Sequence, residues 1–85
     1  MAEPGLKWDI EIDAAGLLCP LPVLKARKRL LPMATGTVLR LIATDPAAVV
    51  DVPHFCREAG HDLLGIHPAP EGHPPEARAY LIRRG

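Results

Sequence analysis

The spacing of the apolar residues changes repeatedly along this chain, and that succession limits the folds it can adopt. Residues 8–13 alternate apolar and acidic side chains, a period of two that indicates a half-buried strand. From Pro20 to about Leu31 the apolar residues follow a helical spacing instead, and Pro32 ends this helix. The run 37–44 is rich in apolar and β-branched residues and predicts a second strand, central in a sheet.

The predicted first helix has an apolar arc and a basic side. The arc holds Val23, Leu24, Ala26, Leu30 and Leu31. Lys25, Lys28 and Arg29 lie on the other side, whereas Arg27 falls within the apolar arc. Two interpretations of Arg27 are open: its stem packs while its head reaches water, or it pairs with an acid such as Asp45. Lys25, Arg27 and Lys28 are candidates for docking an acidic partner or tRNA.

The segment after residue 44 predicts a helix in two pieces. Asp45 followed by Pro46 is a favourable helix start, with the carboxylate as the N-cap and proline in the first helical position. Pro53 interrupts the pattern soon afterwards. We therefore expect a short helical turn over 46–50 and a new helix over 53–59. Asp45 is also a candidate secondary site residue, because loops that follow strands often form sites in α/β proteins.

The second piece has its own start, apolar face and stop. Asp51 or Val52 would cap it, and Gly60 is well placed as a left-handed stop. Its apolar face holds Val52, Phe55, Cys56 and Ala59. Cys56 is therefore interpreted as a core residue. The alternative is a resolving thiol, which would have to lie within disulfide distance of Cys19.

The last part of the chain predicts two further strands, over 61–68 and 77–84, joined by a loop. The resulting order is β-α-β-α-β-β. Right-handed crossovers between the early strands would put both helices on one face. We expect a two-layer α/β sandwich over a mixed four-stranded sheet, with residues 1–85 forming a single domain.

Composition excludes several classes of function. The 85 residues carry 10 basic and 10 acidic side chains, so direct binding of nucleic acid or of an anionic membrane is not expected. No apolar run is long enough to cross a bilayer, and residues 1–9 do not resemble a secretory signal. We expect a cytoplasmic protein, monomeric by default, whose two cysteines are free thiols.

Cys19 stands where the first predicted helix begins, in the stretch GLLCPLPVLKARKRLLP. Unpaired amides at a helix start favour negative charge, so a lowered pKa is expected for this thiol. Pro20 and Pro22 lose no intrahelical hydrogen bond there and would stiffen the connection that carries the sulfur. An exposed, activated thiol of this kind can hold sulfane sulfur as a persulfide. The alternative is a small, buried hydrophobic residue, and the spacing does not decide between the two.

Four segments of the chain resemble the TusA-like (SirA-like) sulfur-carrier family. They are GLLCPLPVLKARKRL with its Cys-Pro-x-Pro motif, ATDP at 43–46, DVPHFCREAGHDLL at 51–64, and the ending YLIRRG. The resemblance covers nearly the whole chain in family order. It implies the same β-α-β-α-β-β sandwich and makes Cys19 the persulfide-bearing residue, with Pro20 and Pro22 as its mount.

The resemblance also implies what the protein does and with which partners. It implies a sulfurtransferase without a cofactor that takes sulfur from a cysteine desulfurase or rhodanese-like donor and passes it to an acceptor protein. Family destinations are tRNA thiolation, molybdenum-cofactor biosynthesis and sulfur oxidation. The exposed apolar residues Leu17, Leu18 and Leu21 would then belong to a docking surface. The alternative is a non-catalytic regulatory or RNA-binding module of the same fold.

The histidines give no metal signal. His54, Cys56 and His61 match no zinc spacing, and a fourth ligand would have to come from elsewhere. His67 and His73 lie in loop-like segments with no partner in view. No metal site is expected.

Overall fold

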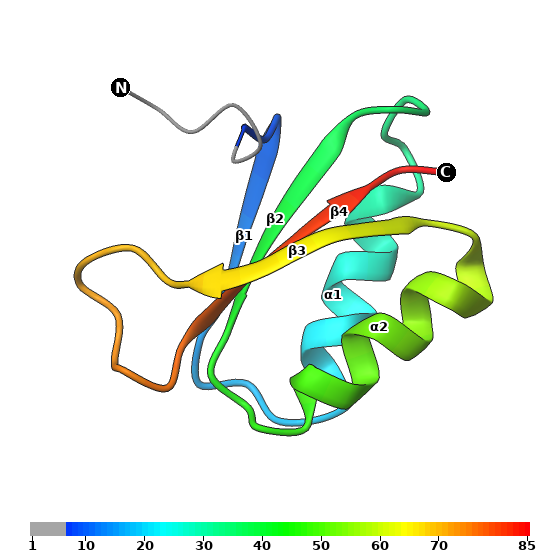
Figure 1. The fold of residues 1–85 in the computed structure, drawn as a ribbon. Coiled ribbons are helices and arrows are strands. Elements are labelled where there is room, and N and C mark those ends of the chain that lie inside the picture. Colours follow the sequence, from blue (N-terminus) through cyan, green and yellow to red (C-terminus); the bar gives the residue numbers. More distant parts are fainter. Residues whose placement is uncertain (1–6) are drawn as a thin grey trace.

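The structure, a computed structural model, describes residues 7–85. Its elements follow in the predicted order: β1 (Ile10–Ala14), α1 (Leu21–Leu30), β2 (Val38–Ala43), α2 (Ala48–Ala59), β3 (Asp62–Pro68) and β4 (Arg78–Arg83) (Figure 1). No helix in this range has the length and apolar character that crossing a membrane requires. The expectation about a secretory signal concerns mainly residues 1–6, which lie outside the described residues.

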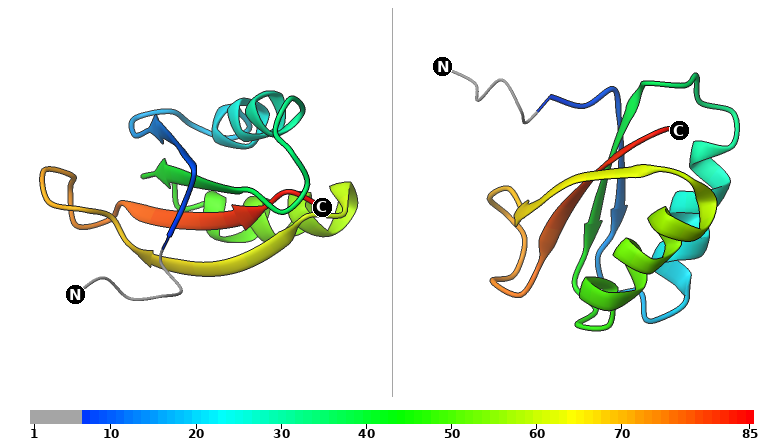
Figure 2. Two further views of the ribbon diagram at one scale, coloured as in Figure 1. Left: turned by 90° about the horizontal axis from the view of Figure 1, so that it is seen from above. Right: turned by 45° about the vertical axis from the view of Figure 1, so that its right-hand side comes forward.

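The four strands form one mixed sheet in the order β1-β2-β4-β3. β1 and β2 are parallel, with Ala14 opposite Ala43 at their carboxyl ends, and the remaining pairs are antiparallel. β2 is an interior strand, as predicted. Figure 2 shows α1 and α2 together on one side of the sheet, which confirms the two-layer architecture.

The main core fills the space between the sheet and the helices. Its fully buried members include Leu39 and Leu41 of β2, Tyr80 and Ile82 of β4, Leu30 of α1 and Val52 of α2. Alternate residues of each strand face this layer, because side chains in a strand point to opposite faces in turn. The core therefore fixes both helices against the interior strands.

The apolar arc predicted for α1 is only partly correct. Ala26 and Leu30 are buried, but Leu24 is 48% exposed and Leu31 is 67% exposed. The buried residues of the helix are Pro22, Ala26 and Leu30, a narrow stripe with a spacing of four. A helix that lies over the edge of a sheet contacts it along one stripe, so an arc as wide as the one predicted is not covered.

The predicted break in the second helix is wrong. Ala48–Ala59 is one continuous helix with Pro53 inside it and Ala47 as its N-cap, so neither Asp51 nor Val52 is a cap. Pro53 cannot donate to the carbonyl of Val49, but Val49 is 51% exposed and water can reach this part of the helix. Burial of the apolar face on both sides of the proline keeps the helix in one piece.

Gly60 ends this helix in the left-handed conformation, with φ 79°, as predicted. The apolar face is also confirmed for Val52, Phe55 and Cys56, which are buried. Ala59, at the end of the helix, is exposed.

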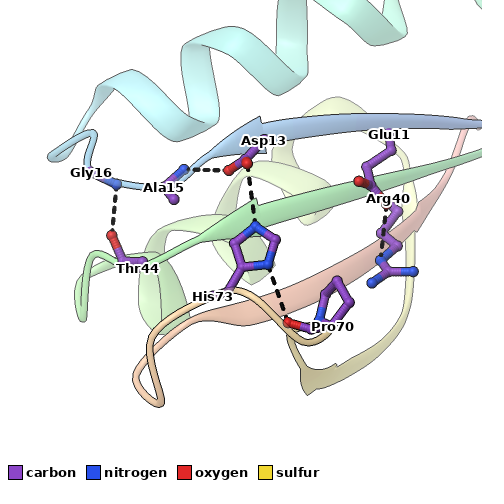
Figure 3. Close-up of polar contacts among 8 residues, drawn as sticks. All are labelled: Glu11, Asp13, Ala15, Gly16, Arg40, Thr44, Pro70 and His73. Atoms are coloured by element: carbon purple, nitrogen blue, oxygen red, sulfur yellow. Dashed lines mark hydrogen bonds and ion pairs between the residues drawn. The ribbon is translucent and has the colours of Figure 1, made fainter.

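The loop between β3 and β4 covers part of the other face of the sheet. Ala69 and Ala77 of this segment pack with Ile42 and Ala79, which are almost fully buried. His73 of the same loop reaches β1, where its Nε2 lies 3.2 Å from Oδ2 of Asp13 (Figure 3). The expectation that His73 has no partner is therefore wrong, and nothing in the local sequence indicates a contact across 60 residues.

Candidate functional site

Cys19 lies immediately before α1 and is an exposed free thiol. Pro20 is the N-cap residue, joined to Cys19 by a cis peptide bond, and Pro22 lies within the first turn. The prediction that both prolines fall at the start of the helix is confirmed. The exposure of Cys19 removes the alternative in which it is a buried hydrophobic residue.

Residues 15–20, between β1 and α1, form the loop that carries Cys19, here called the cysteine loop. Two side chains of the loop after β2 hold it in place. The amide of Gly16 donates to Oγ1 of Thr44 at 2.9 Å (Figure 3). The amide of Cys19 donates to Oδ2 of Asp45 at 2.5 Å. The two loops meet because β1 and β2 are parallel neighbours whose carboxyl ends share one edge of the sheet.

Asp45 therefore joins two loops and is not a helix cap. Its Oδ1 accepts a hydrogen bond from the amide of Ala47 at 3.1 Å while its Oδ2 holds Cys19. Neither oxygen caps the start of α2, and no other side chain in the described part of the chain does. The role of Thr44 was not predicted from the sequence, although its position directly after the parallel neighbour of β1 is a signal that could have found it.

The sulfur lies at a cavity of about 300 Å³ between the start of α1 and one side of α2. The lining comes from both helices: Cys19, Pro20, Val23, Asp51, His54, Phe55 and Glu58. Most of its lining surface is apolar, and its charged members, Asp51 and Glu58, are acidic. The second helix thus supplies most of the surroundings of a thiol that the first helix positions.

The pKa of this thiol is shifted in the direction opposite to the prediction, and Asp51 is the main cause. Its carboxylate, acting first as a hydrogen-bond acceptor and also as a negative charge, raises the pKa of Cys19, and Asp45 adds a smaller effect in the same direction. Desolvation also contributes to the raised pKa. The expected lowering is therefore wrong, because a carboxylate that accepts a hydrogen bond from the thiol favours the protonated form, and desolvation does the same.

A scan of the sequence matches the family model "Sulfurtransferase TusA" over residues 10–73, which includes the cysteine loop, both helices and the first three strands. The chain belongs to the TusA family. It is 49% identical over 57 residues to the sulfur carrier protein TusA of Allochromatium vinosum, covering 67% of this chain and 75% of that protein. It is 42% identical over 66 residues to the TusA of Pseudomonas syringae pv. syringae, covering 75% and 79%.

The fold is shared with a crystal structure of a SirA-like protein from Desulfitobacterium hafniense. The TM-score is 0.74 over 91% of this chain and 99% of that one, at 23% sequence identity. This match supports the fold alone. The matches to TusA proteins support a sulfur-carrier role, and with it the existence of a sulfur donor and a sulfur acceptor.

In this member of the TusA family, several apolar side chains near the starts of the two helices are exposed. Leu18 is 67% exposed and Leu21 is 47% exposed, on either side of the Cys19–Pro20 step. Val49 and Val50 at the start of α2 are exposed as well. Leu17 is different, because it packs against the core, so the expectation that it is exposed is wrong.

The basic residues of α1 divide into two groups. Lys25, Lys28 and Arg29 line a groove beside β1 and do not line the cavity of Cys19. Arg27 is exposed on another side, over a small cavity that includes Phe55. Within residues 7–85 Arg27 forms no ion pair, so the interpretation in which its head reaches water is favoured over a pair with Asp45.

Cys56 is a core residue, as predicted. It is 2% exposed, and burial, as the largest cause, raises its pKa to about 11. Of the histidines that raised the question of a metal, His61 uses Nδ1 to accept the amide of Gly85 at 2.9 Å. Among residues 7–85 no three His, Cys, Asp or Glu side chains gather as a metal site would require.

Proposed function

We propose that Cys19 accepts sulfane sulfur from the persulfide of a donor protein and passes it to a thiol of an acceptor protein. The observation that carries this proposal is the exposed thiol at the start of α1, in a loop that Thr44 and Asp45 hold in one conformation. Pro20 and Pro22 add to this rigidity. A fixed, accessible sulfur is what exchange between two protein thiols requires, because the attacking and leaving sulfur atoms must line up.

The exchange conserves atoms and electrons. Sγ of Cys19, without its proton, attacks the outer sulfur of the donor persulfide and forms a new S–S bond. The S–S bond within the donor breaks, and its electron pair leaves on the donor cysteine, which takes up a proton. No external oxidant or reductant takes part, and the same step in the other direction loads the acceptor.

Asp51 makes the thiol of Cys19 harder to ionise, because its carboxylate raises the pKa of that thiol. Since the pKa of the thiol is raised, the free protein carries mainly the protonated form at neutral pH. The thiolate is the attacking species, so the proton must leave as the donor docks.

The docking surface of this proposal is the apolar surface next to the cysteine. Leu18 and Leu21, on either side of the Cys19–Pro20 step, are exposed, and exposed apolar groups that lie together mark interaction sites. A donor of the cysteine desulfurase or rhodanese-like class would cover them and bring its persulfide over the cavity. Lys25, Arg27 and Lys28 lie further along α1 and would contact the edge of such a partner at most.

The test is the intact mass of the protein after incubation with a cysteine desulfurase and cysteine. Wild type should gain the mass of one sulfur atom, and Cys19→Ala should gain none. Cys56→Ala is the matched control and should still gain it, because Cys56 is buried. A wild-type protein that never gains this mass, or a Cys19→Ala variant that gains it equally, would show that the proposal is wrong.

A further inference from the structure

A second groove lies on the side of α1 that faces away from the Cys19 cavity. Its volume is about 650 Å³, and its lining comes from one strand, one helix and the turn after it: Glu11, Ile12, Asp13, Lys25, Lys28, Arg29 and Pro32. It shares no residue with the cavity of Cys19. Sulfur transfer as proposed above gives this groove at most an edge contact with the donor, through Lys25 and Lys28.

One wall of the groove is an edge strand. β1 pairs only with β2, so in the part of the chain that the structure describes its outer side has no strand partner. The backbone N–H and C=O groups on that side are available to a further strand, as on any open sheet edge. The groove therefore offers main-chain hydrogen bonds along one wall.

The other wall is basic. α1 contains no Asp or Glu. None of Lys25, Lys28 and Arg29 forms an ion pair with an acid among residues 7–85. Three cations on one side of one helix therefore face the groove without local compensation.

The two carboxylates of the groove are turned toward partners within the protein. Glu11 pairs with Nε of Arg40 at 3.4 Å. Asp13 lies 3.2 Å from His73 and accepts the amide of Ala15 at 3.0 Å. Figure 3 shows both side chains directed toward these partners. The charge left over in the groove is positive.

We propose that this groove binds an extended acidic segment of a partner protein, which adds a strand to the free edge of β1 and places carboxylates against Lys25, Lys28 and Arg29. Such strand addition takes affinity from the main chain and specificity from alternate side chains. Side chains on one face of a strand recur about every 6.6 Å. Residues four apart on a helix are separated by about 6 Å along its axis. Acidic residues at every second position would therefore match the spacing of Lys25 and Arg29.

Single-stranded RNA fits the groove less well than a peptide does. Its phosphates would satisfy the cations, but no aromatic side chain lines the groove to stack a base. Bound RNA would also leave the outer edge of β1 without main-chain hydrogen bonds. The inference does not depend on sulfur transfer, because it uses none of the residues around Cys19.

The first experiment titrates ¹⁵N-labelled protein with a decapeptide that carries Glu at alternate positions and Thr between them. We expect saturable binding at low salt, with amide shifts confined to β1 and the basic side of α1. A peptide with Gln in place of Glu should lose binding, and so should one with Pro at two central Thr positions, because Pro cannot pair in a ladder. Equal binding by the Pro peptide would overturn strand addition.

The second experiment compares two exposed charge reversals of equal size on the two helices. Lys28→Glu should weaken peptide binding about fivefold, since it removes one exposed ion pair and adds a repulsion. Arg57→Glu, on α2 and outside the groove, should change it by less than about twofold. Equal effects of the two charge reversals on peptide binding would overturn the proposal. So would the absence of saturable binding by any peptide, or binding of an RNA oligomer in place of the peptide. Cys19→Ala, which should gain no sulfur, is expected to bind the peptide as wild type does, so the two proposals fail separately.

Discussion

Replacing Asp45 by alanine tests how the cysteine loop is held. The wild-type carboxylate accepts two backbone hydrogen bonds, from Cys19 at 2.5 Å and from Ala47 at 3.1 Å. These bonds connect the loop after β1 to the loop after β2. Alanine removes both acceptors and leaves two N–H groups to find other partners.

The magnitude follows from the charge of the acceptor and from the exposure of the donors. A hydrogen bond to a charged group contributes about 1.5–3 kcal/mol. The bond to Cys19 is exposed, so water replaces part of it, whereas the bond to Ala47 is partly buried. We therefore expect Asp45→Ala to lower the free energy of unfolding by about 2 kcal/mol in total. In a domain of this size that corresponds to a fall in Tm of about 10 °C.

The assay is thermal and urea unfolding followed by circular dichroism. Asp45→Asn keeps one carbonyl oxygen as an acceptor and should lose about half as much stability. Asp62→Ala is the matched control, because its carboxylate is 59% exposed and pairs with Arg83 on the surface. That pair should contribute less than about 1 kcal/mol. If Asp45→Ala is no less stable than Asp62→Ala, Asp45 does not hold the cysteine loop as described.

Two further predictions concern the thiol and the core. Asp51→Asn removes the main cause of the raised pKa of Cys19, so the rise in its alkylation rate with pH should move to lower pH and the rate at neutral pH should increase. Glu58 lines the same cavity, and Glu58→Gln should leave the alkylation profile unchanged. Superimposable profiles of wild type and Asp51→Asn would contradict the role of Asp51. Leu30→Ala should cost about 3 kcal/mol in chemical denaturation. Leu31→Ala, 67% exposed in wild type, should cost less than about 0.5 kcal/mol, and equal losses would contradict the packing of α1.

The order and type of the elements could be predicted because each has a clear periodicity. The alternation before Ala14 and the β-branched run ending at Ala43 are local signals, and both became strands. The errors have a common origin in tertiary packing. Pro53 is a helix breaker in isolation, but burial of Val52 and Phe55 against the sheet maintains the helix around it. Leu24 had the right spacing to be buried, but no helix or strand among residues 7–85 covers it.

The candidate site could be predicted only in its local part. The motif around Cys19 indicates an exposed thiol at a helix start, because Pro20 and Pro22 belong to the same short segment. Thr44 and Asp51 act on this segment from 28 and 32 positions away, through the parallel pairing of β1 with β2 and the packing of α2 beside α1. The sequence contains both residues but does not show which side of α2 faces the sulfur.

That missing contact changes the pKa of the cysteine. The start of α1 contributes about half a unit of positive charge, spread over its free amides and effective only within the first turn. Asp51 contributes a full negative charge with a hydrogen bond to the sulfur, and Asp45 lies nearby. The carboxylates oppose that field, and together with desolvation they raise the pKa of Cys19. The first helix and its prolines thus determine where the sulfur lies, and Asp51 of α2 makes its ionisation less favourable.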